Sequence, residues 1–416
     1  MTARHLARTQ MPPYSEVFAV PGFAALFVAG ALSTWGDYIA RLTVAAVVYD
    51  RTSSPLATAT TLAVSLLPSI FGRTLLGPLA DRLPYKYVLV CSHLSRALMV
   101  LVLIALVTAE APLAALLVAL FVLETLGGPA AAANQVLLTD LFTDRRVYVR
   151  ALGMTALSEQ LNQAVGLVLG ALIVSGLGAV RGLVADLLTF VVSAVVVLVV
   201  VKVRPVVGDS SPGLRGFFDD LGAAIAHIAR HPVLSRLLLL SLVSAVGVAA
   251  PEAVAIPYAG GAGLGGLLMA APIAGAALGV VVVSRWEPRV SNDRIILLAL
   301  AMPVPLLFTV VGLSTPVVFV LWFISGTLQA FMVPLQSTFT LVTPSDRRGT
   351  IFGLAGALSV TAAGLSYLLA GWFSELATPG AAVTMCAVIC LGAVVLLAAR
   401  WPRRVLDEAV QAAYRE

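Results

Sequence analysis

The stretch Gly77-Pro-Leu-Ala-Asp81-Arg82-Leu-Pro-Tyr-Lys86 joins two apolar segments, 56–76 and 88–107. Each segment is long enough to cross a bilayer as a helix, which takes about 20 apolar residues. The link between them holds one acidic and two basic side chains within six residues. A connection without a function needs only a turn, so this spacing indicates a role for the link at the membrane edge.

The composition identifies the whole chain as a membrane protein. Of its 416 residues, 60% are hydrophobic and only 11% are charged, whereas soluble proteins carry about 25% charged residues. A chain of this composition cannot cover a globule with polar surface. Its apolar runs are continuous, unlike the alternating strands of a membrane barrel, so we expect an all-α integral membrane fold.

Twelve apolar segments fit transmembrane helices. An even number of spans puts both termini on the same side of the membrane. The expected spans are 22–49, 57–80, 86–108, 112–139, 149–177, 180–202, 233–257, 263–284, 294–313, 316–341, 349–375 and 380–400.

The basic residues indicate which side holds the termini. With both termini inside, 21 of the 26 Lys and Arg residues fall in inside loops and tails, two in outside loops and three in spans. Cytoplasmic loops carry the excess of basic residues, so both termini are expected in the cytoplasm. The N-terminal residues lack the pattern of a cleaved signal peptide, and the composition favours a GC-rich bacterial genome. We therefore expect a multi-pass protein of the bacterial inner (plasma) membrane.

The chain divides into two halves, each with six expected helices. The boundaries are 1–202 for the first half, 203–232 for a cytoplasmic linker, 233–400 for the second half and 401–416 for a cytoplasmic tail. Apolar residues recur in the linker at the spacing of a helix that lies on the membrane surface. They are Leu214, Phe217, Phe218, Leu221, Ile225 and Ile228.

The two halves repeat one another. Gln135 and Gln336 lie near the ends of spans 4 and 10, at an offset of 201 residues. Asp-Arg-Arg triplets follow at 144–146 and 346–348, at an offset of 202. The second half has no acid at the position that corresponds to Asp81. Repeated halves around a central linker are typical of a transporter whose site lies between them.

On these residues the chain resembles the major facilitator superfamily, in particular its twelve-helix bacterial drug:proton antiporters, which include macrolide and siderophore exporters. Gly77-x-x-x-Asp81-Arg82-x-x-x-Lys86 is similar to the family's loop motif between helices 2 and 3, G-x-x-x-D-R-x-G-R-R/K, although Pro84 and Tyr85 replace the usual Gly and Arg. The segment 166–171 lies where antiporters carry G-P-x-x-G-G, but it lacks the Pro and the last Gly.

The resemblance implies a mechanism. In the family, two halves rock around a cavity lined by helices 1, 4, 7 and 10, and the loop motif acts as a conformational latch. Its residues here are Gly77, Asp81, Arg82 and Lys86. In the family, the Asp of this motif faces the start of helix 11, which is near Gly349 in this chain. The resemblance therefore implies that the positive end of the helix 11 dipole attracts the Asp81 carboxylate.

Charged residues within the expected spans are the candidates for the transport chemistry. Each costs about 2.5–3.5 kcal/mol at the bilayer centre, so several together require partners or a water-filled cavity. There are eight such residues, and all but Glu252 lie in the first half. The eight are Asp37, Arg41, Arg73, Arg96, Glu124, Glu159, Asp186 and Glu252.

Asp37, Glu124 and Glu159 are the candidates for proton coupling. Asp37 and Arg41 share a helix face, so they either line the cavity or neutralise one another. Glu124 has no base one turn away, and burial without a partner favours protonation; the alternative is an ion pair with Arg41 or Arg96 from another helix. Glu159 either titrates during transport or lies satisfied in a packing seam.

The remaining charged residues have more modest expected roles. Glu252 either contacts a cationic substrate or reaches the outer interface. Asp186 is expected at the interface, and Arg73 and Arg96 are expected to be counter-ions. Gly166 and Gly170, four residues apart on one helix, should allow close helix packing.

The second half supplies the other expected wall of the cavity. Gln329, Gln336 and Phe331, with nearby hydroxyl and aromatic residues, suit a bulky and mostly apolar ligand. Together with Asp37, Arg41, Glu124, Gln135 and Glu252, they form the expected substrate cavity.

These features predict a secondary transporter that exports a hydrophobic or amphipathic small molecule, driven by proton flow. The alternatives are uptake of a metabolite by proton symport or uniport, and a membrane sensor or scaffold that transports nothing. The chain has no phosphate-binding loop and no metal-ligand or hydrolase pattern, so neither enzyme activity nor a cofactor is expected. The expected partners are a small molecule, protons and lipid, not nucleic acid, and the chain is expected to be a monomer.

Overall fold

The computed structural model describes residues 13–68, 83–142, 144–203, 222, 224–286, 294–344 and 347–401, and no strand occurs among them. The helices of the first half are α2 (Tyr14–Phe18), α3 (Phe23–Thr52), α4 (Pro55–Leu66), α6 (Tyr85–Thr108), α7 (Leu113–Thr125), α8 (Gly128–Leu141), α9 (Arg145–Leu177) and α10 (Ala179–Val200). Those of the second half are α12 (Pro232–Ala259), α13 (Ala262–Val283), α15 (Ile295–Ala301), η1 (Pro305–Val311), α16 (Thr315–Leu328), η2 (Gln329–Phe331), α17 (Met332–Val342), α18 (Arg348–Leu376) and α19 (Pro379–Ala399).

The all-α membrane fold is confirmed. Within the described residues, ten helical segments are long and apolar enough to cross a membrane, with Leu113–Leu141 (α7 and α8) and Thr315–Val342 (α16 to α17) each counted as one. Two shorter apolar helices, Pro55–Leu66 and Ile295–Val311, occupy the positions of the remaining two expected spans. The chain is therefore a multi-pass membrane protein, and its twelve-span count stays a prediction.

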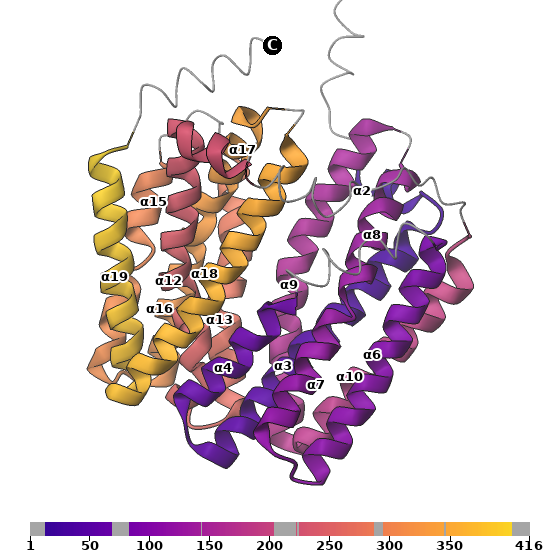
Figure 1. Ribbon diagram of the computed structural model, residues 1–416, viewed down its shortest axis with the longest axis horizontal. Helices are drawn as coiled ribbons and strands as arrows, with labels where there is room; N and C mark the ends of the chain where they lie inside the picture. The colour runs from indigo at the N-terminus through magenta and orange to yellow at the C-terminus, as the bar shows by residue number, and fades with distance from the viewer. Residues whose placement is uncertain are drawn as a thin grey trace, which may run out of the picture.

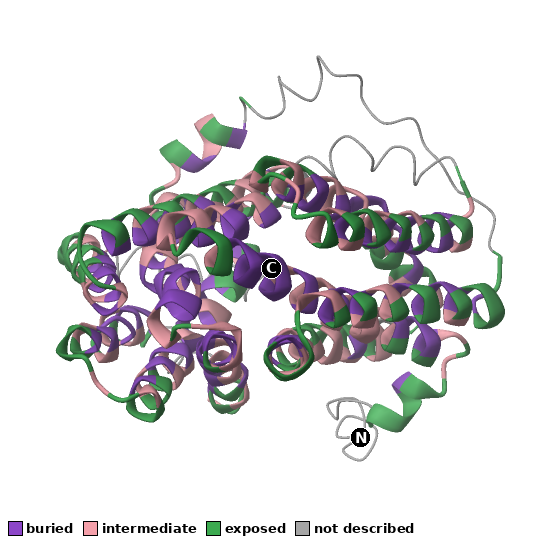
Figure 2. Ribbon diagram, turned by 90° about the horizontal axis from the view of Figure 1, so that it is seen from below, coloured by how far each residue is buried: buried purple, intermediate pink, exposed green. Residues whose placement is uncertain are grey.

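The helices form two groups that correspond to the two expected halves. Figure 1 shows α3–α10 in one group and α12–α19 in the other, with both ends of the described chain on the same face. We call this the terminal face, and the other the opposite face. Figure 2 shows that exposed residues line the outside of both groups. Many are large and apolar, such as Leu98 and Val199, which is the surface that a multi-pass protein turns toward lipid tails.

Three of the expected continuous spans are interrupted, and in span 10 the short helix η2 separates α16 from α17. Span 4 divides into α7 and α8 at Gly127-Gly128-Pro129, where Pro129 lacks the N–H that would continue the helix. The Gly127 N–H instead donates to the Glu124 carbonyl at 3.1 Å, which leaves the Leu123 carbonyl free for a side chain. Span 9 likewise divides into α15 and η1 around two prolines, Pro303 and Pro305.

The linker is described only near its end. Residues 224–230 are helical, and Ala224 and Ile228 are buried against the core of the second half, whereas Ile225 is half exposed. The other apolar residues of the expected surface helix lie outside the described residues. The part that is described thus packs on its own protein, and the domain boundaries stay predictions.

The two halves meet closely toward the opposite face. One core cluster draws residues from both halves, including Leu167 and Ala171 of α9 and Leu268 of α13. A Cβ at Gly266 would lie 2.7 Å from the Ala171 Cβ, so α13 approaches α9 closely only because this residue is glycine. A Cβ at Gly371 of α18 would likewise lie 2.6 Å from Ala59 of α4. These contacts close the protein on this face.

A hydrogen-bonded link between the halves adds to this closure. The Glu375 carboxylate of α18 accepts from the Ser54 hydroxyl and, at 3.2 Å, from the Leu56 N–H. Ser54 is the N-cap of α4, and its hydroxyl oxygen also accepts from the Ala57 N–H at 3.0 Å. An acid of the second half thus caps a helix of the first, where negative charge is favourable.

Replacing Glu375 by alanine should shift the protein toward states that open on the opposite face. The lost cap and charge-assisted bonds correspond to about 0.5–2 kcal/mol, or up to about 30-fold in a conformational equilibrium. Spin labels at the opposite-face ends of α9 and α13 would report a larger population of long distances. Asp50→Ala, which removes an exposed acid from the same face, is the control and should leave the distances unchanged. Equal distance distributions in both variants would show that the link does not hold the halves together.

Candidate functional site

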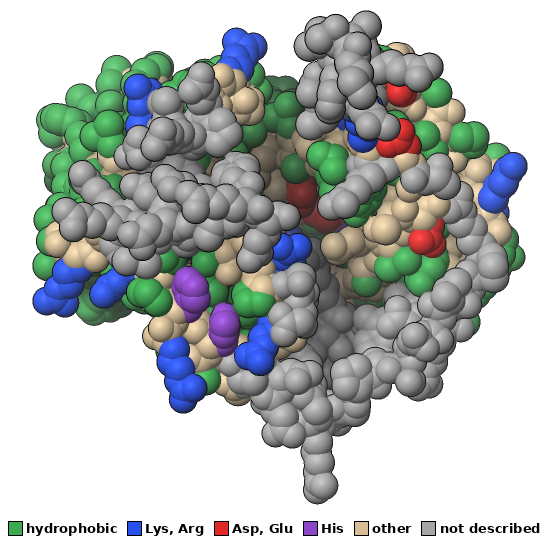
Figure 3. All heavy atoms as spheres, turned by 90° about the horizontal axis from the view of Figure 1, so that it is seen from above, with side chains coloured by type: hydrophobic (Ala, Val, Ile, Leu, Met, Phe, Trp, Pro, Cys, Tyr) green, Lys and Arg blue, Asp and Glu red, His purple; other side chains and the backbone are tan. Residues whose placement is uncertain are grey.

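A cavity of about 800 Å³ enters the protein from the terminal face. Figure 3 shows the hollow between the halves, with acidic side chains at depth. Its lining comes mainly from the first half, and only Val360 comes from α18. The expected site residues that line it are Asp37, Arg41, Arg96, Glu124, Gln135 and Glu159.

A smaller pocket of about 180 Å³ continues this cavity and lies between the two halves. The two share five lining residues, among them Tyr38, Arg41 and Gln163. The second half contributes Glu252, Gln329 and Tyr367 with several apolar side chains. We call this space the inter-half pocket. Because both halves line it, a molecule held there would contact both halves.

Arg41 and Glu124 form an ion pair across two helices beside this pocket. The guanidinium donates from Nε to Oε1 at 2.6 Å and from Nη2 to Oε2 at 3.0 Å. Both side chains are largely buried, with 18% and 8% exposed, and Arg41 also lies 5.0 Å from the centre of the Tyr38 ring. The hypothesis of an unpartnered Glu124 is therefore wrong, and the alternative, an ion pair with Arg41 from another helix, is what the structure shows.

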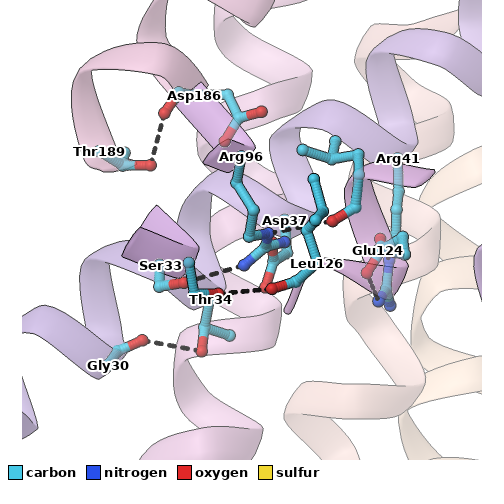
Figure 4. Close-up of polar contacts among 12 residues, drawn as sticks. Gly30, Ser33, Thr34, Asp37, Arg41, Arg96, Glu124, Leu126, Asp186 and Thr189 are labelled. Carbon is cyan, nitrogen blue, oxygen red and sulfur yellow. Dashed lines mark hydrogen bonds and ion pairs between the residues drawn. The ribbon is translucent and has the colours of Figure 1, made fainter. Parts of the chain in front are cut away.

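Arg96 of α6 holds the second ion pair. It binds the Asp37 carboxylate, and it also donates to the Ser33 hydroxyl at 3.3 Å and to the Leu123 carbonyl at 3.2 Å. That carbonyl is the one freed by the break between α7 and α8. The guanidinium lies 4.2 Å from the centre of the Phe190 ring. Figure 4 shows both ion pairs close together on the helices around α3.

Of the two alternatives for Asp37 and Arg41, the structure agrees with the cavity wall: both residues line the cavity, and they do not pair with one another. The two residues are one turn apart on α3, but each finds its partner on a neighbouring helix. A bidentate carboxylate is a better partner for an arginine than a carboxylate on the same helix, because both N–H groups point along the oxygen lone pairs. Helix-to-helix pairing also joins α3 to α6 and α7.

Glu159 lies on the polar side of α9 and is exposed in the cavity. In the described part of the chain, no hydrogen bond or ion pair to its carboxylate is found. Three residues further on, Asn162 accepts a hydrogen bond from the Trp35 indole at 2.9 Å. Gly166 and Gly170 pack against α3, where a Cβ would lie 3.0 Å from the Trp35 Cα and 3.2 Å from the Ile39 Cα, respectively.

Glu252 lies inside the protein, in the inter-half pocket. Its carboxylate accepts a hydrogen bond of 2.6 Å from the Tyr367 hydroxyl of α18. The alternative in which this acid reaches the outer interface does not fit its position. The bond joins α12 to α18 within the second half.

Three expected positions are wrong. Phe331 is fully buried in the core of the second half, because η2 turns its side chain toward α12 and α15. Gln336 is exposed on α17 and lines neither the cavity nor the inter-half pocket. Asp186 is not interfacial; it is fully buried on α10 beside Gly36, since the absence of a side chain at Gly36 leaves space for it.

Most of the loop motif that opened the sequence analysis lies outside the described residues. This holds for Gly77, Asp81, Arg82 and the expected counter-ion Arg73. Lys86 is described, at the start of α6 on the terminal face.

The sequence analysis did not single out several residues that the structure brings together. Tyr38, Gln160 and Tyr367 all line the inter-half pocket. Tyr38 follows Asp37 and Gln160 follows Glu159 in the sequence, so their position next to a candidate acid could have identified both. Tyr367 could have been identified only as a hydroxyl-bearing residue in an apolar run. No group of three or more His, Cys, Asp or Glu residues suited to a metal ion occurs among the described residues.

Comparison with known proteins agrees with this architecture. A solved structure, that of a mutant of the nucleoside transporter NupG, superposes with a TM-score of 0.73 at 12% sequence identity, over 91% of this chain and 99% of that one. At this identity the likeness shows the fold. None of the curated proteins matches the sequence. The family model described as Major Facilitator Superfamily matches residues 26–341, the greater part of the chain. With a cavity between two helical halves, the chain belongs to the Major Facilitator Superfamily and is a secondary transporter, not an enzyme.

Proposed function

We propose that this transporter takes up a small hydrogen-bonding metabolite in symport with protons, and that the inter-half pocket holds the substrate. The observation that carries the proposal is the lining of that pocket. Three amides, Gln160, Gln163 and Gln329, and two tyrosines surround a space with apolar walls. Convergent polar groups on an apolar wall are typical of sites for compact organic molecules.

The lining favours this reading over export of a bulky apolar compound. That expectation rested on an aromatic wall in the second half, but Trp322, Phe331 and Phe339 are all buried in the core. The likeness to a nucleoside transporter adds support, since a nucleoside is a neutral ring compound with several hydrogen-bonding groups. Nucleosides are therefore the first class of substrate to test.

Alternating access accounts for the shape of the molecule. The cavity opens on the terminal face, while α4, α9, α13 and α18 close the opposite face. If the terminal face is cytoplasmic, as the basic residues predict, this conformation opens inward. In this proposal Asp81 acts as a latch against the start of α18, and the chain works as a monomer in the bacterial inner membrane.

Proton coupling would use the charged groups of the first half. Glu159 offers an acid to the cavity without a described partner, and Asp37 is 21% exposed while it pairs with Arg96. Protonation of Asp37 would release Arg96, and protonation of Glu124 would release Arg41. Either event would loosen contacts between helices that must rearrange during transport.

Export of an amphipathic cation is the second candidate function, and Glu252 favours it. This acid lines the inter-half pocket with the Tyr367 hydroxyl as its hydrogen-bond donor, and it forms no ion pair with a base in the part of the chain that the structure describes. A cationic substrate could supply that balance. Export coupled to protons would place the chain with the drug:proton antiporters that its motifs resemble.

Transport in proteoliposomes distinguishes the two candidates. Radiolabelled nucleosides, neutral sugars and lipophilic cations would be offered under an imposed pH gradient of either direction. Saturable accumulation of a neutral compound, driven by an inward proton gradient, is the expected result. Accumulation of lipophilic cations driven by an outward proton gradient, so that cations enter as protons leave, would instead establish proton antiport. That result would favour export and overturn the uptake proposal.

Gln329→Leu should weaken substrate binding, with KM raised about tenfold, since an unmatched hydrogen-bonding group of a buried substrate costs about 1–3 kcal/mol. The measurement is the initial rate of uptake into proteoliposomes as a function of the concentration of the transported compound. Gln336→Leu is the matched control, because this amide lies outside the pocket, and it should leave KM unchanged. If the two variants behave alike, the substrate does not bind in the inter-half pocket.

A further inference from the structure

Asp186 is a buried acid without a visible partner. Its side chain is fully buried on α10, and neither carboxylate oxygen has a hydrogen-bond partner among the described residues. The adjacent Thr189 hydroxyl donates a hydrogen bond of 2.7 Å to the backbone carbonyl of Asp186. A carboxylate buried in this way is strongly unfavourable, whereas the neutral acid is tolerated.

The charges around Asp186 come from three neighbouring helices. Asp37 is on α3, Arg96 is on α6, and Glu124 is on α7. His93, also on α6, lies beside Phe190 of α10, with the ring centres 6.3 Å apart. The Nδ1 atom of His93 is also buried without a partner. Figure 4 shows Asp186 beside the pair formed by Arg96 and Asp37.

Counting these groups leaves one acid over. Arg41 donates two hydrogen bonds to Glu124. Arg96 donates to Asp37, to the Ser33 hydroxyl and to the Leu123 carbonyl. Each arginine therefore matches one carboxylate. Asp186, the third acid of the cluster, forms no ion pair with any residue that the structure describes.

We propose that Asp186 is a proton-binding site and that it shares Arg96 with Asp37. In the conformation described here, Asp186 holds the proton and Arg96 neutralises the Asp37 carboxylate. In the other arrangement, Arg96 turns to Asp186, the Asp186 O–H bond breaks, and Asp37 forms an O–H bond with the proton. The three groups keep a net charge of zero throughout.

This arrangement would connect a buried site with the cavity. Asp37 lines the cavity and can exchange its proton with water there, whereas Asp186 cannot reach it. Arg96 also holds the carbonyl at the break between α7 and α8. Its movement from Asp37 to Asp186 would therefore alter the contact between α6 and that break. The inference deepens the proposed proton coupling and rests on it for its role in transport.

Infrared spectroscopy of the purified protein in nanodiscs, without substrate, tests directly whether Asp186 is protonated. The spectrum of each variant is subtracted from that of the wild type. At neutral pH the wild type should show the carbonyl stretch of a protonated carboxylic acid. Asp186→Asn, which mimics the neutral acid in size and shape, should lose this band. Asp50→Asn, a change in an exposed acid at the far end of α3, should keep it.

The shared arginine has a separate test. In Asp37→Asn, Arg96 loses its carboxylate and should turn to Asp186, so that the band is again lost although Asp186 is present. A band that persists in Asp186→Asn, or that is missing from the wild type, would overturn the assignment of the proton. A band that persists in Asp37→Asn would overturn the sharing of Arg96, and this variant also serves if Asp186→Asn fails to fold.

The band is read without transport, so its outcome is independent of the substrate. If no compound moves under a pH gradient, the proposed symport fails, while the band still decides whether Asp186 holds a proton. If transport is proton-driven but the band does not depend on Asp186, the coupling acid lies elsewhere and only this inference fails.

Discussion

Replacing Arg96 by leucine is expected to destabilise the protein by about 3–5 kcal/mol, the usual cost of leaving a buried charge without its partner, and to abolish transport. The variant loses the ion pair with Asp37 and the hydrogen bond that satisfies the Leu123 carbonyl at the break between α7 and α8. It also leaves Asp37 next to a second buried acid, Asp186. The measurement is thermal unfolding in detergent micelles, followed by a transport assay of the protein that remains folded.

Two variants bracket this result. Arg96→Lys keeps the charge, but its three N–H groups lie on one nitrogen and cannot span the acceptors that Nε, Nη1 and Nη2 of the guanidinium reach. This variant should therefore lie between the leucine variant and the wild type. Arg51→Leu is the control: this exposed arginine also donates two hydrogen bonds, to the carbonyls of Ala111 and Val107. Its loss should cost about 1 kcal/mol or less, as is usual for exposed polar contacts. Equal unfolding temperatures for Arg96→Leu and Arg51→Leu would show that Arg96 does not hold the network together.

Breaking the pair between Arg41 and Glu124 on one side only is the second large expected effect. Arg41→Met leaves a carboxylate that is 8% exposed, and Glu124→Leu leaves a guanidinium that is 18% exposed. Each single variant should lose about 2–4 kcal/mol, somewhat less than a fully buried pair because the cavity admits water to both groups.

The double variant should be more stable than either single variant. With both charges gone, no unpaired ion remains, so the double-mutant cycle should give a coupling of about 1–3 kcal/mol. Transport should nevertheless be lost in all three, because Arg41 and Glu124 line the cavity through which the substrate passes in the proposed mechanism. Strict additivity of the two single effects would contradict the pairing described here.

The sequence predicted the fold well because membrane helices are specified locally. Long apolar runs give the spans, and the repeated Gln and Asp-Arg-Arg positions give the two halves. The breaks within spans 4 and 9 follow from Gly127-Gly128-Pro129 and from Pro303 and Pro305, whose effect on backbone hydrogen bonding is also local. The continuous spans that we expected there neglected this effect.

The site was harder to predict, because pairing depends on how helices rotate and approach one another. Spacing along α3 placed Asp37 and Arg41 on one face, yet their partners come from α6 and α7. Asp186 looked interfacial from its position in the span, but the space beside Gly36 places it in the interior. Phe331 and Gln336 lay in the expected helix, but a local turn at η2 sends one into the core and leaves the other exposed. Whether such a side chain points into the core, into the cavity or to the surface depends on how the helices pack.

Substrate-driven proton movement is the most direct test of the central claim, that a substrate in the inter-half pocket moves together with protons through the charged network of the first half. Proteoliposomes with a pH-sensitive dye inside would receive the transported compound outside, with no pH gradient imposed at the start. The account predicts that the lumen becomes more acidic, and that Asp186→Asn abolishes this change while substrate exchange continues. A lumen that becomes more alkaline would show antiport, and substrate entry with no change of internal pH would contradict the account.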